Sequence, residues 1–266
     1  MACRLFAAVV VIAGCSGLVR AEPAIDTLIA AYPDQLAGYE NGALIWKDGT
    51  RMAVPDGRTG KTLREMLDAP DILDQFAIPY RLGPQAAKPA TDEDPGRVRY
   101  EPFFRKMYGD CHDDTFKSRL VAVPWLPERG GGTLLVTPVN GVADKLAAVS
   151  RELARLTPRF TRFMVPSSGT FNCRAIAGTD RTSMHAYAAA IDLNSRLGDY
   201  WLWTKAKAGK FAWVNRVPFD IVEIFERYGF IWGGKWFHYD TMHFEYRPEI
   251  VAFAKQGWPA VAKPPP

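Results

Sequence analysis

The chain has 266 residues, of which 48% are hydrophobic and 23% are charged. This composition is typical of a globular protein, and the length allows one large domain or a core with an added lobe. The formal net charge of +4 comes from 33 basic and 29 acidic residues, and the basic residues form no run or stripe. Such a mild and scattered charge excludes the sequence signature of a nucleic-acid-binding protein.

The N-terminus is typical of an export signal, and two processing routes fit it. Residues 1–21 combine a weakly positive start, an apolar run at Leu5–Ala13 and a small-residue cleavage site ending at Ala21. The segment Ile12–Cys15 also resembles a lipobox, which would leave a lipid anchor on Cys15. The apolar run is too short to span a membrane, and no later run approaches that length. We therefore expect an exported protein of the periplasm or cell envelope, without a transmembrane helix in the mature chain.

If cleavage follows Ala21, two cysteines remain in the mature chain, Cys111 and Cys173. An even pair in an oxidising compartment favours a disulfide. The absence of a C-x-x-C motif argues against a cysteine zinc site.

Residues 22–99 are predicted to form an N-terminal extension. Its predicted elements are a short helix over Glu22–Pro33, a hairpin of Ala43–Lys47 with Arg51–Val54, and a second short helix at Thr62–Leu67. Residues 79–96 are rich in Pro, Gly, Ala and Asp, which indicates a linker or surface loop. The extension carries no functional motif, and either lining a substrate groove or covering one face of the domain would account for it.

Residues 100–250 are predicted to form the main domain, followed by a Pro-rich tail at 251–266. The clearest helix is Val142–Leu156, because apolar residues recur every three or four positions and form one stripe. The other predicted elements are strands at Leu120–Trp125, Thr133–Pro138 and Phe163–Pro166, an insertion or lid at Leu197–Arg216, and a helix over Pro218–Tyr228.

Two stretches carry the residues with the clearest chemistry. In the first, His185 and Asp192 are seven positions apart, and in the second His243 follows Asp240 by three positions. Two imidazoles and one carboxylate form a tetrahedral zinc set whose fourth position is left for water. Asp240 is the candidate base for that water. Alternating polarity over 240–245 predicts a strand that presents His243 and Glu245 on one face.

The order of these motifs resembles a known family. The patterns S-x-H-x6-D, G-F-x-W-G-G-x-W and D-x-x-H-F-E, over residues 146–246, are similar to those of the zinc D-alanyl-D-alanine carboxypeptidases. That group includes VanY-like carboxypeptidases, vancomycin-resistance dipeptidases and L-alanyl-D-glutamate peptidases of phage lysins. The resemblance implies zinc bound by His185, Asp192 and His243, with Asp240 as the catalytic base. Many relatives have Glu in place of Asp240 and Gly in place of Ala188.

The resemblance also implies a fold and a set of substrate contacts. The fold is α+β, with an antiparallel sheet that carries the zinc site and helices packed on one face, plus an N-terminal lobe of helix and hairpin. Ser183 resembles the family's serine that contacts substrate. Arg174 is either a surface cation or a group that binds a substrate carboxylate or oxyanion. His112 is expected at the surface or behind a ligand, and His238 behind a ligand or against substrate.

We therefore expect a zinc-dependent peptidase that hydrolyses bonds in peptidoglycan stem peptides, of the D-Ala-D-Ala carboxypeptidase type. Removal of a terminal D-Ala, cleavage of a cross-link and cleavage of L-Ala–D-Glu all fit the motifs. The alternative is a zinc-containing envelope protein that binds peptidoglycan without cutting it.

Overall fold

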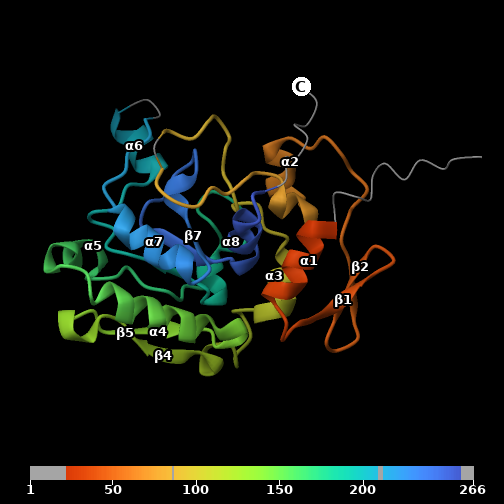
Figure 1. Cartoon of the computed structure of the whole chain (residues 1–266), viewed down its shortest axis with the longest axis horizontal. Helices are drawn as coiled ribbons and strands as arrows, with labels where there is room; N and C mark the ends of the chain where they lie inside the picture. The colour runs from red at the N-terminus through yellow and green to blue at the C-terminus, as the bar shows by residue number, and fades with distance from the viewer. Residues whose placement is uncertain (1–21, 86, 209–211, 259–266) are drawn as a thin grey trace, which may run out of the picture.

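The computed structural model describes residues 22–85, 87–208 and 212–258 (Figure 1). The predicted signal, Cys15 and the last eight residues of the predicted tail lie outside these ranges. Helices alternate with small antiparallel sheets, so the expected α+β fold is confirmed. Within the described ranges, no helix has the length and apolar character needed to cross a membrane.

The central sheet is antiparallel and has the strand order β6-β8-β7. Its strands are β6 (Ala190–Asp192), β7 (Phe230–Trp232) and β8 (His243–Tyr246). All four residues of β8 are buried, because the strand lies in the middle of the sheet and is covered on both faces. Successive side chains of a strand point to opposite faces, so β8 places His243 and Glu245 on one face and Phe244 on the other.

Helix α7 (Phe219–Arg227) covers the face of the sheet that carries Phe244. The ring of Phe225 stacks on that of Phe244, with centroids 4.0 Å apart. The helix ends as predicted, because Gly229 has a φ of 87° that favours glycine. The opposite face of the sheet is therefore left for the polar side chains of β8.

A second layer lies beyond α7. Helix α4 (Val142–Leu153) packs between α7 and the hairpin of β4 (Val121–Pro124) and β5 (Thr133–Val136), as Figure 1 shows. The predicted apolar stripe of α4 is buried at Val142, Leu146, Val149 and Leu153. The helix and both strands were predicted from sequence and are confirmed.

The strand predicted at Phe163–Pro166 is wrong. Residues Thr161–Met164 form the single-turn helix α5. The buried residues Phe160, Phe163 and Met164 follow helical spacing rather than the alternation of a strand. A run this short does not distinguish the two periods in a sequence.

The N-terminal lobe contains the predicted helices and hairpin, with one further strand. Its elements are α1 (Glu22–Ala31), β1 (Leu36–Glu40), β2 (Ala43–Trp46), β3 (Arg51–Ala53), α2 (Leu63–Asp68) and α3 (Glu101–Tyr108). The additional strand β1 pairs with β2 and makes the hairpin a three-stranded sheet. The lobe also packs against α8 (Pro248–Lys255), which spans the boundary expected between domain and tail at residue 250.

Buried hydrogen bonds join the lobe to the main domain. The Tyr32 hydroxyl donates to Glu249 over 2.6 Å, and the Tyr80 hydroxyl donates to Glu226 over 2.8 Å. All four side chains are buried. Because a buried carboxylate without a partner is costly, these bonds fix the extension against the domain.

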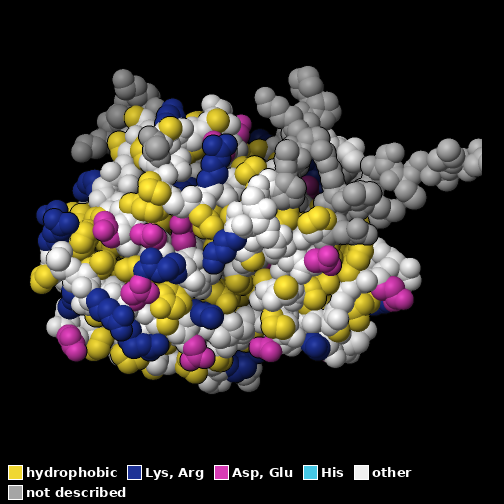
Figure 2. All heavy atoms as spheres, viewed as in Figure 1, with side chains coloured by type: hydrophobic (Ala, Val, Ile, Leu, Met, Phe, Trp, Pro, Cys, Tyr) yellow, Lys and Arg dark blue, Asp and Glu magenta, His cyan; other side chains and the backbone are white. Residues whose placement is uncertain are grey.

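The predicted insertion contains helix α6 (Trp201–Ala208), which carries the exposed side chain of Trp203. Figure 2 shows Lys and Arg side chains dispersed over one face of the molecule among acidic and apolar ones.

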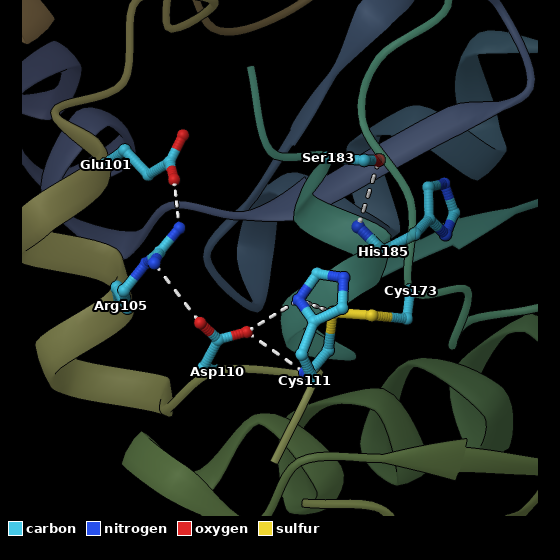
Figure 3. The surroundings of a disulfide bond; sticks show 8 residues. Glu101, Arg105, Asp110, Cys111, Cys173, Ser183 and His185 are labelled. Carbon is cyan, nitrogen blue, oxygen red and sulfur yellow. Dashed lines mark hydrogen bonds and ion pairs between the residues drawn. A yellow bond between two sulfur atoms is a disulfide. The ribbon is translucent and has the colours of Figure 1, made fainter. Parts of the chain in front are cut away.

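A disulfide joins Cys111, which follows α3, to Cys173, which lies one residue before Arg174 (Figure 3). The two residues are 62 positions apart in the sequence. Close by, Asp110 accepts a hydrogen bond from the His112 backbone over 3.0 Å and contacts the His112 ring at 2.9 Å. The exposed His112 therefore belongs to the surroundings of the disulfide rather than to the zinc set.

We predict that the exported protein contains no free thiol from Cys111 or Cys173. Alkylation of the mature protein under denaturing conditions, followed by mass spectrometry, should add no label. Replacing both cysteines by serine should lower the free energy of unfolding by roughly 3–4 kcal/mol, the chain-entropy value for a loop of this size. Two labelled cysteines in protein isolated from an oxidising compartment would contradict the prediction.

Candidate active site and metal centre

His185 lies in a single 3-10 turn at Met184–Tyr187. Ser183 begins this turn, because its hydroxyl accepts a hydrogen bond from the His185 backbone N–H over 3.3 Å. Ala188 ends it in the left-handed region, with φ 52° and ψ 31°. Glycine adopts this conformation without strain, which gives a physical reason for the glycine that many relatives carry here.

Asp192 and His243 are brought together by the sheet. They are direct partners in the antiparallel pairing of β6 with β8. Side chains of directly opposed residues project from the same face of a sheet. The register of this strand pair therefore brings two candidate ligands together although they are 51 positions apart in the sequence.

Three candidate ligand atoms meet at one point. His185 Nε2 lies 3.1 Å from His243 Nδ1 and 3.2 Å from Asp192 Oδ1, and His243 Nδ1 lies 3.0 Å from the same oxygen. Three ligands of a tetrahedral zinc ion, at bonds of about 2.0–2.2 Å, lie roughly 3.3–3.5 Å from one another. The three atoms thus form a triangle only a few tenths of an ångström smaller than a zinc site requires.

The outer hydrogen bonds set which ring nitrogens carry hydrogen. His185 Nδ1 lies 2.8 Å from the carbonyl oxygen of Thr170, which can only accept, so this nitrogen donates. His243 Nε2 lies 3.0 Å from the carboxylate of Glu245, so it donates as well. The inner nitrogens, His185 Nε2 and His243 Nδ1, are then left to bind a cation together with Asp192.

The electrostatics of the site favour a positive charge at this point. Burial alone would lower the pKa of His243, but its hydrogen bonds to Asp192 and Glu245 raise it to about 10. Burial would raise the pKa of Glu245, but Arg99 and the bond from His243 hold it well below its usual value. A proton on His243 Nδ1 and a metal ion are alternative ways to supply the positive charge, since metal binding releases the protons of its ligands.

Asp240 precedes β8 rather than lying in it, because the strand begins at His243. Its backbone N–H donates to the Gly233 carbonyl over 3.0 Å, and its own carbonyl lies 2.6 Å from where a side chain on Gly233 would begin. Only glycine allows this approach, which explains one glycine of the W-G-G motif. The Oδ1 atom of Asp240 is buried without a hydrogen-bond partner among the described residues.

The pKa of Asp240 is unusual for a carboxylic acid. Burial, and then the negative charge of Asp192, raise it to about 7. An acid with a pKa near neutral pH both accepts and returns a proton readily. A buried, unpartnered and basic carboxylate beside a cation site has the properties of a general base.

The predicted site residues share one pocket of about 530 Å³, here called the central pocket. Its lining includes all three candidate ligands together with Ser183, Asp240, Arg174, His238, Trp236, Arg97 and Arg99. Arg174 is exposed and donates to the Ala175 carbonyl over 3.2 Å, while Ser183 is buried. His238 contacts the Asp94 carboxylate at 2.7 Å, which places the ring beside the site without making it a ligand.

Several site residues were not identified from the sequence. Glu245 orients His243, and its place two residues further on the same strand was the signal that could have revealed it. Arg99 binds Glu245 through Nε at 3.1 Å and through a second nitrogen. Arg97 binds Asp94 at 2.9 Å. No local pattern indicates the contact of Arg99 with Glu245, because it joins the N-terminal extension to a residue 146 positions away.

A second acidic cluster does not compete for a metal ion. Asp56, Asp71 and Asp74 also gather their carboxylates, but the ammonium group of Lys61 lies 2.5 Å from Asp56 and 2.5 Å from Asp74. Lys61 is buried and supplies the positive charge itself. This cluster is an internal ion-pair network in the N-terminal lobe.

Comparisons with known proteins agree with the family resemblance. No curated protein and no solved structure matches the chain. A family model described as D-alanyl-D-alanine carboxypeptidase matches residues 177–246, a segment that holds His185, Asp192, Asp240 and His243. Over this segment the chain is therefore similar to the D-alanyl-D-alanine carboxypeptidase family of peptidases.

Proposed function

We propose that this protein is a zinc-dependent peptidase of the cell envelope that hydrolyses peptidoglycan stem peptides, of the D-alanyl-D-alanine carboxypeptidase type. The observation that carries the proposal is the meeting of His185 Nε2, His243 Nδ1 and Asp192 Oδ1 within 3.0–3.2 Å of one another. The family match supports peptidase chemistry on D-Ala-D-Ala peptides. The choice of zinc rests on the donor set.

Two imidazoles and one carboxylate fit zinc better than harder cations, which prefer sites made of oxygen ligands. Glu245 and the Thr170 carbonyl hold the two rings in the orientation that metal binding needs. A bound zinc ion would polarise the scissile carbonyl and lower the pKa of a bound water to about 7. Residues of the chain would supply the proton transfers and the substrate contacts.

Asp240 is proposed to be the general base and then the general acid. Asp240 lines the central pocket, where its carboxylate would accept a proton from the attacking water. The pKa of about 7 then allows it to give that proton to the leaving amine. An ordinary Asp, with a pKa near 3.9, would be a poor donor at neutral pH.

Ser183 and Arg174 are proposed to contact the substrate. The Ser183 oxygen already accepts a hydrogen bond from His185, which leaves its hydroxyl hydrogen free to donate into the central pocket. The exposed guanidinium of Arg174 has no ion pair among the described residues, so it is available to a substrate carboxylate or oxyanion. The disulfide at Cys173 anchors the backbone next to it.

The alternative is a zinc protein that binds peptidoglycan without cutting it. Such a protein has no need of a base, and a buried carboxylate without a partner is costly to keep. The unpartnered Oδ1 of Asp240 and the raised pKa of its carboxyl group therefore favour the enzyme over the binding protein.

The proposed function predicts cleavage of muropeptides that stops when metal is removed. Purified mature protein should release a defined fragment from a muropeptide digest, read by mass spectrometry, and a chelator should abolish the release until zinc is restored. In the same digest, Arg174→Gln and Ser183→Ala should raise KM if these side chains contact the substrate. Binding of muropeptides with no product from the zinc-loaded protein would support the alternative.

The ligand assignment predicts one zinc ion per chain. His243→Ala should lose stoichiometric zinc at nanomolar free metal, because the two remaining ligands bind the ion too weakly at that concentration. His112→Ala is the matched control, since its exposed imidazole lies beside the disulfide, and it should keep its zinc. Zinc retained by His243→Ala under these conditions would exclude the assignment.

The base assignment predicts that Asp240→Asn separates zinc binding from turnover. Zinc should stay in place, because the three ligands are untouched, and the rate should fall by roughly 10²–10⁴, the range for a positioned acid–base group. If Asp240 instead orients a ligand, zinc affinity should drop by about 10–100-fold together with the rate. Both quantities should be measured on one preparation, and activity near wild type would exclude either role.

A further inference from the structure

A second pocket of about 250 Å³, here called the side pocket, lies next to the central pocket and shares Arg97 and Arg99 with it. Its other walls come from Leu67–Pro70 at the end of α2, Tyr100–Pro102 at the start of α3, and Arg181 with Tyr187. The volume is about eight times that of a water molecule in the liquid, enough for a short acidic group. Apart from Arg181 and its neighbours, these walls lie outside the segment that matches the family model.

The charges that line the side pocket do not balance. Arg97 is paired with Asp94 and Arg99 with Glu245. The two acidic residues of the pocket, Asp68 and Glu101, have arginine partners of their own, Arg64 and Arg105. The charges within each of these ion pairs cancel, and the positive charge of Arg181 remains unbalanced.

Arg181 is held in an unfavourable environment. Its Nε is buried without a hydrogen-bond partner, and the guanidinium makes no ion pair with any residue that the structure describes. Burial, and then the positive charges of Arg97 and Arg99, lower its pKa below the usual value for arginine. Charged groups that are desolvated in this way normally have a partner.

A second unsatisfied donor lines the same pocket. The hydroxyl of Tyr187 is buried without a hydrogen-bond partner among the described residues. Its ring packs against Phe104 and Tyr108, with centroid distances of 6.2 and 5.9 Å, which limits the movement of the ring. A guanidinium Nε and a phenol hydroxyl that both lack an acceptor point to an anionic ligand with more than one acceptor oxygen.

We propose that the side pocket binds an internal carboxylate of the substrate peptide, one other than the carboxylate at its C-terminus, through Arg181 and Tyr187. The inference rests on the proposed function, which supplies a peptide in the adjoining central pocket. Stem peptides carry such internal carboxylates on their acidic residues. The N-terminal extension then contributes to specificity, because α2 and the segment at 97–102 build most of the pocket.

The test compares two synthetic stem pentapeptides that end in D-Ala-D-Ala. One has every internal carboxylate free, and the other has each of them amidated. Dissociation constants are measured by calorimetry on an Asp240→Asn background, which slows turnover. We expect Arg181→Gln to weaken binding of the free-acid peptide by about 10–100-fold, the value of a hydrogen bond to a charged group, and to change that of the amide by less than about 3-fold. Arg181→Lys should restore part of the loss.

Tyr187→Phe removes only the hydroxyl and should weaken binding of the free-acid peptide by about 3–10-fold. Two matched variants control for charge and for position. Arg155→Gln removes an exposed arginine that lines neither pocket and should change neither peptide's affinity. Arg174→Gln should weaken binding of both peptides to the same extent, because both keep the C-terminal carboxylate. Equal zinc content in all variants shows that the metal centre is intact.

The outcomes separate this inference from the proposed function. If wild type binds both peptides equally, or Arg181→Gln weakens both equally, the side pocket does not bind an internal carboxylate, while the proposed function stands. If zinc-loaded wild type binds neither peptide, the proposed function fails and this inference fails with it. Only a loss confined to the free-acid peptide supports the carboxylate subsite.

Discussion

The rest of the site depends on the hydrogen bonds and ion pairs of the buried Glu245 carboxylate. One oxygen accepts from His243 Nε2 at 3.0 Å, and the same carboxylate binds Arg99 and Arg247. Glu245 and Arg247 are fully buried. A buried charge is tolerated only when its partners are all present, and removing one partner of such a pair typically costs about 3–5 kcal/mol. Glu245 therefore couples the orientation of the His243 ring, a candidate metal ligand, to the folding of the core.

This coupling makes the N-terminal extension part of the active site. Arg99 comes from the end of the extension, and Arg247 donates to the Gly96 carbonyl over 2.6 Å. Residues just before Gly96 also fix the aromatic motif, since the Trp236 indole donates to the Pro95 carbonyl over 2.8 Å. The segment that matches the family model covers residues 177–246, so it contains the candidate metal ligands and Glu245 but not Arg99 or the Thr170 carbonyl, which hold Glu245 and His185. Of the two roles that the sequence left open for the extension, lining a groove is the one that these contacts favour.

The sequence predicted those features that depend on local pattern. Helix α4 followed from its apolar stripe, and the grouping of Asp192 with His243 followed from the metal-ligating residue types and the family resemblance. What the sequence could not predict depends on contacts between distant segments. Arg99 reaches Glu245 across 146 positions, and nothing near either residue indicates the other. The single turn of α5 was mistaken for a strand because one turn gives too few residues to define a period.

The distribution of charge in the pockets has a consequence for how a peptide can lie in them. Asp192 and Asp240 give the central pocket a negative character that attracts a divalent cation but repels an acidic peptide. Arg97 and Arg99 line both pockets, and Arg181 lines the side pocket. A peptide that places a carbonyl at the metal lowers its electrostatic energy by turning its own carboxylates toward the arginines. Under the proposed function, the arginines of the extension would therefore reduce the repulsion between an acidic substrate and the carboxylates of the candidate site.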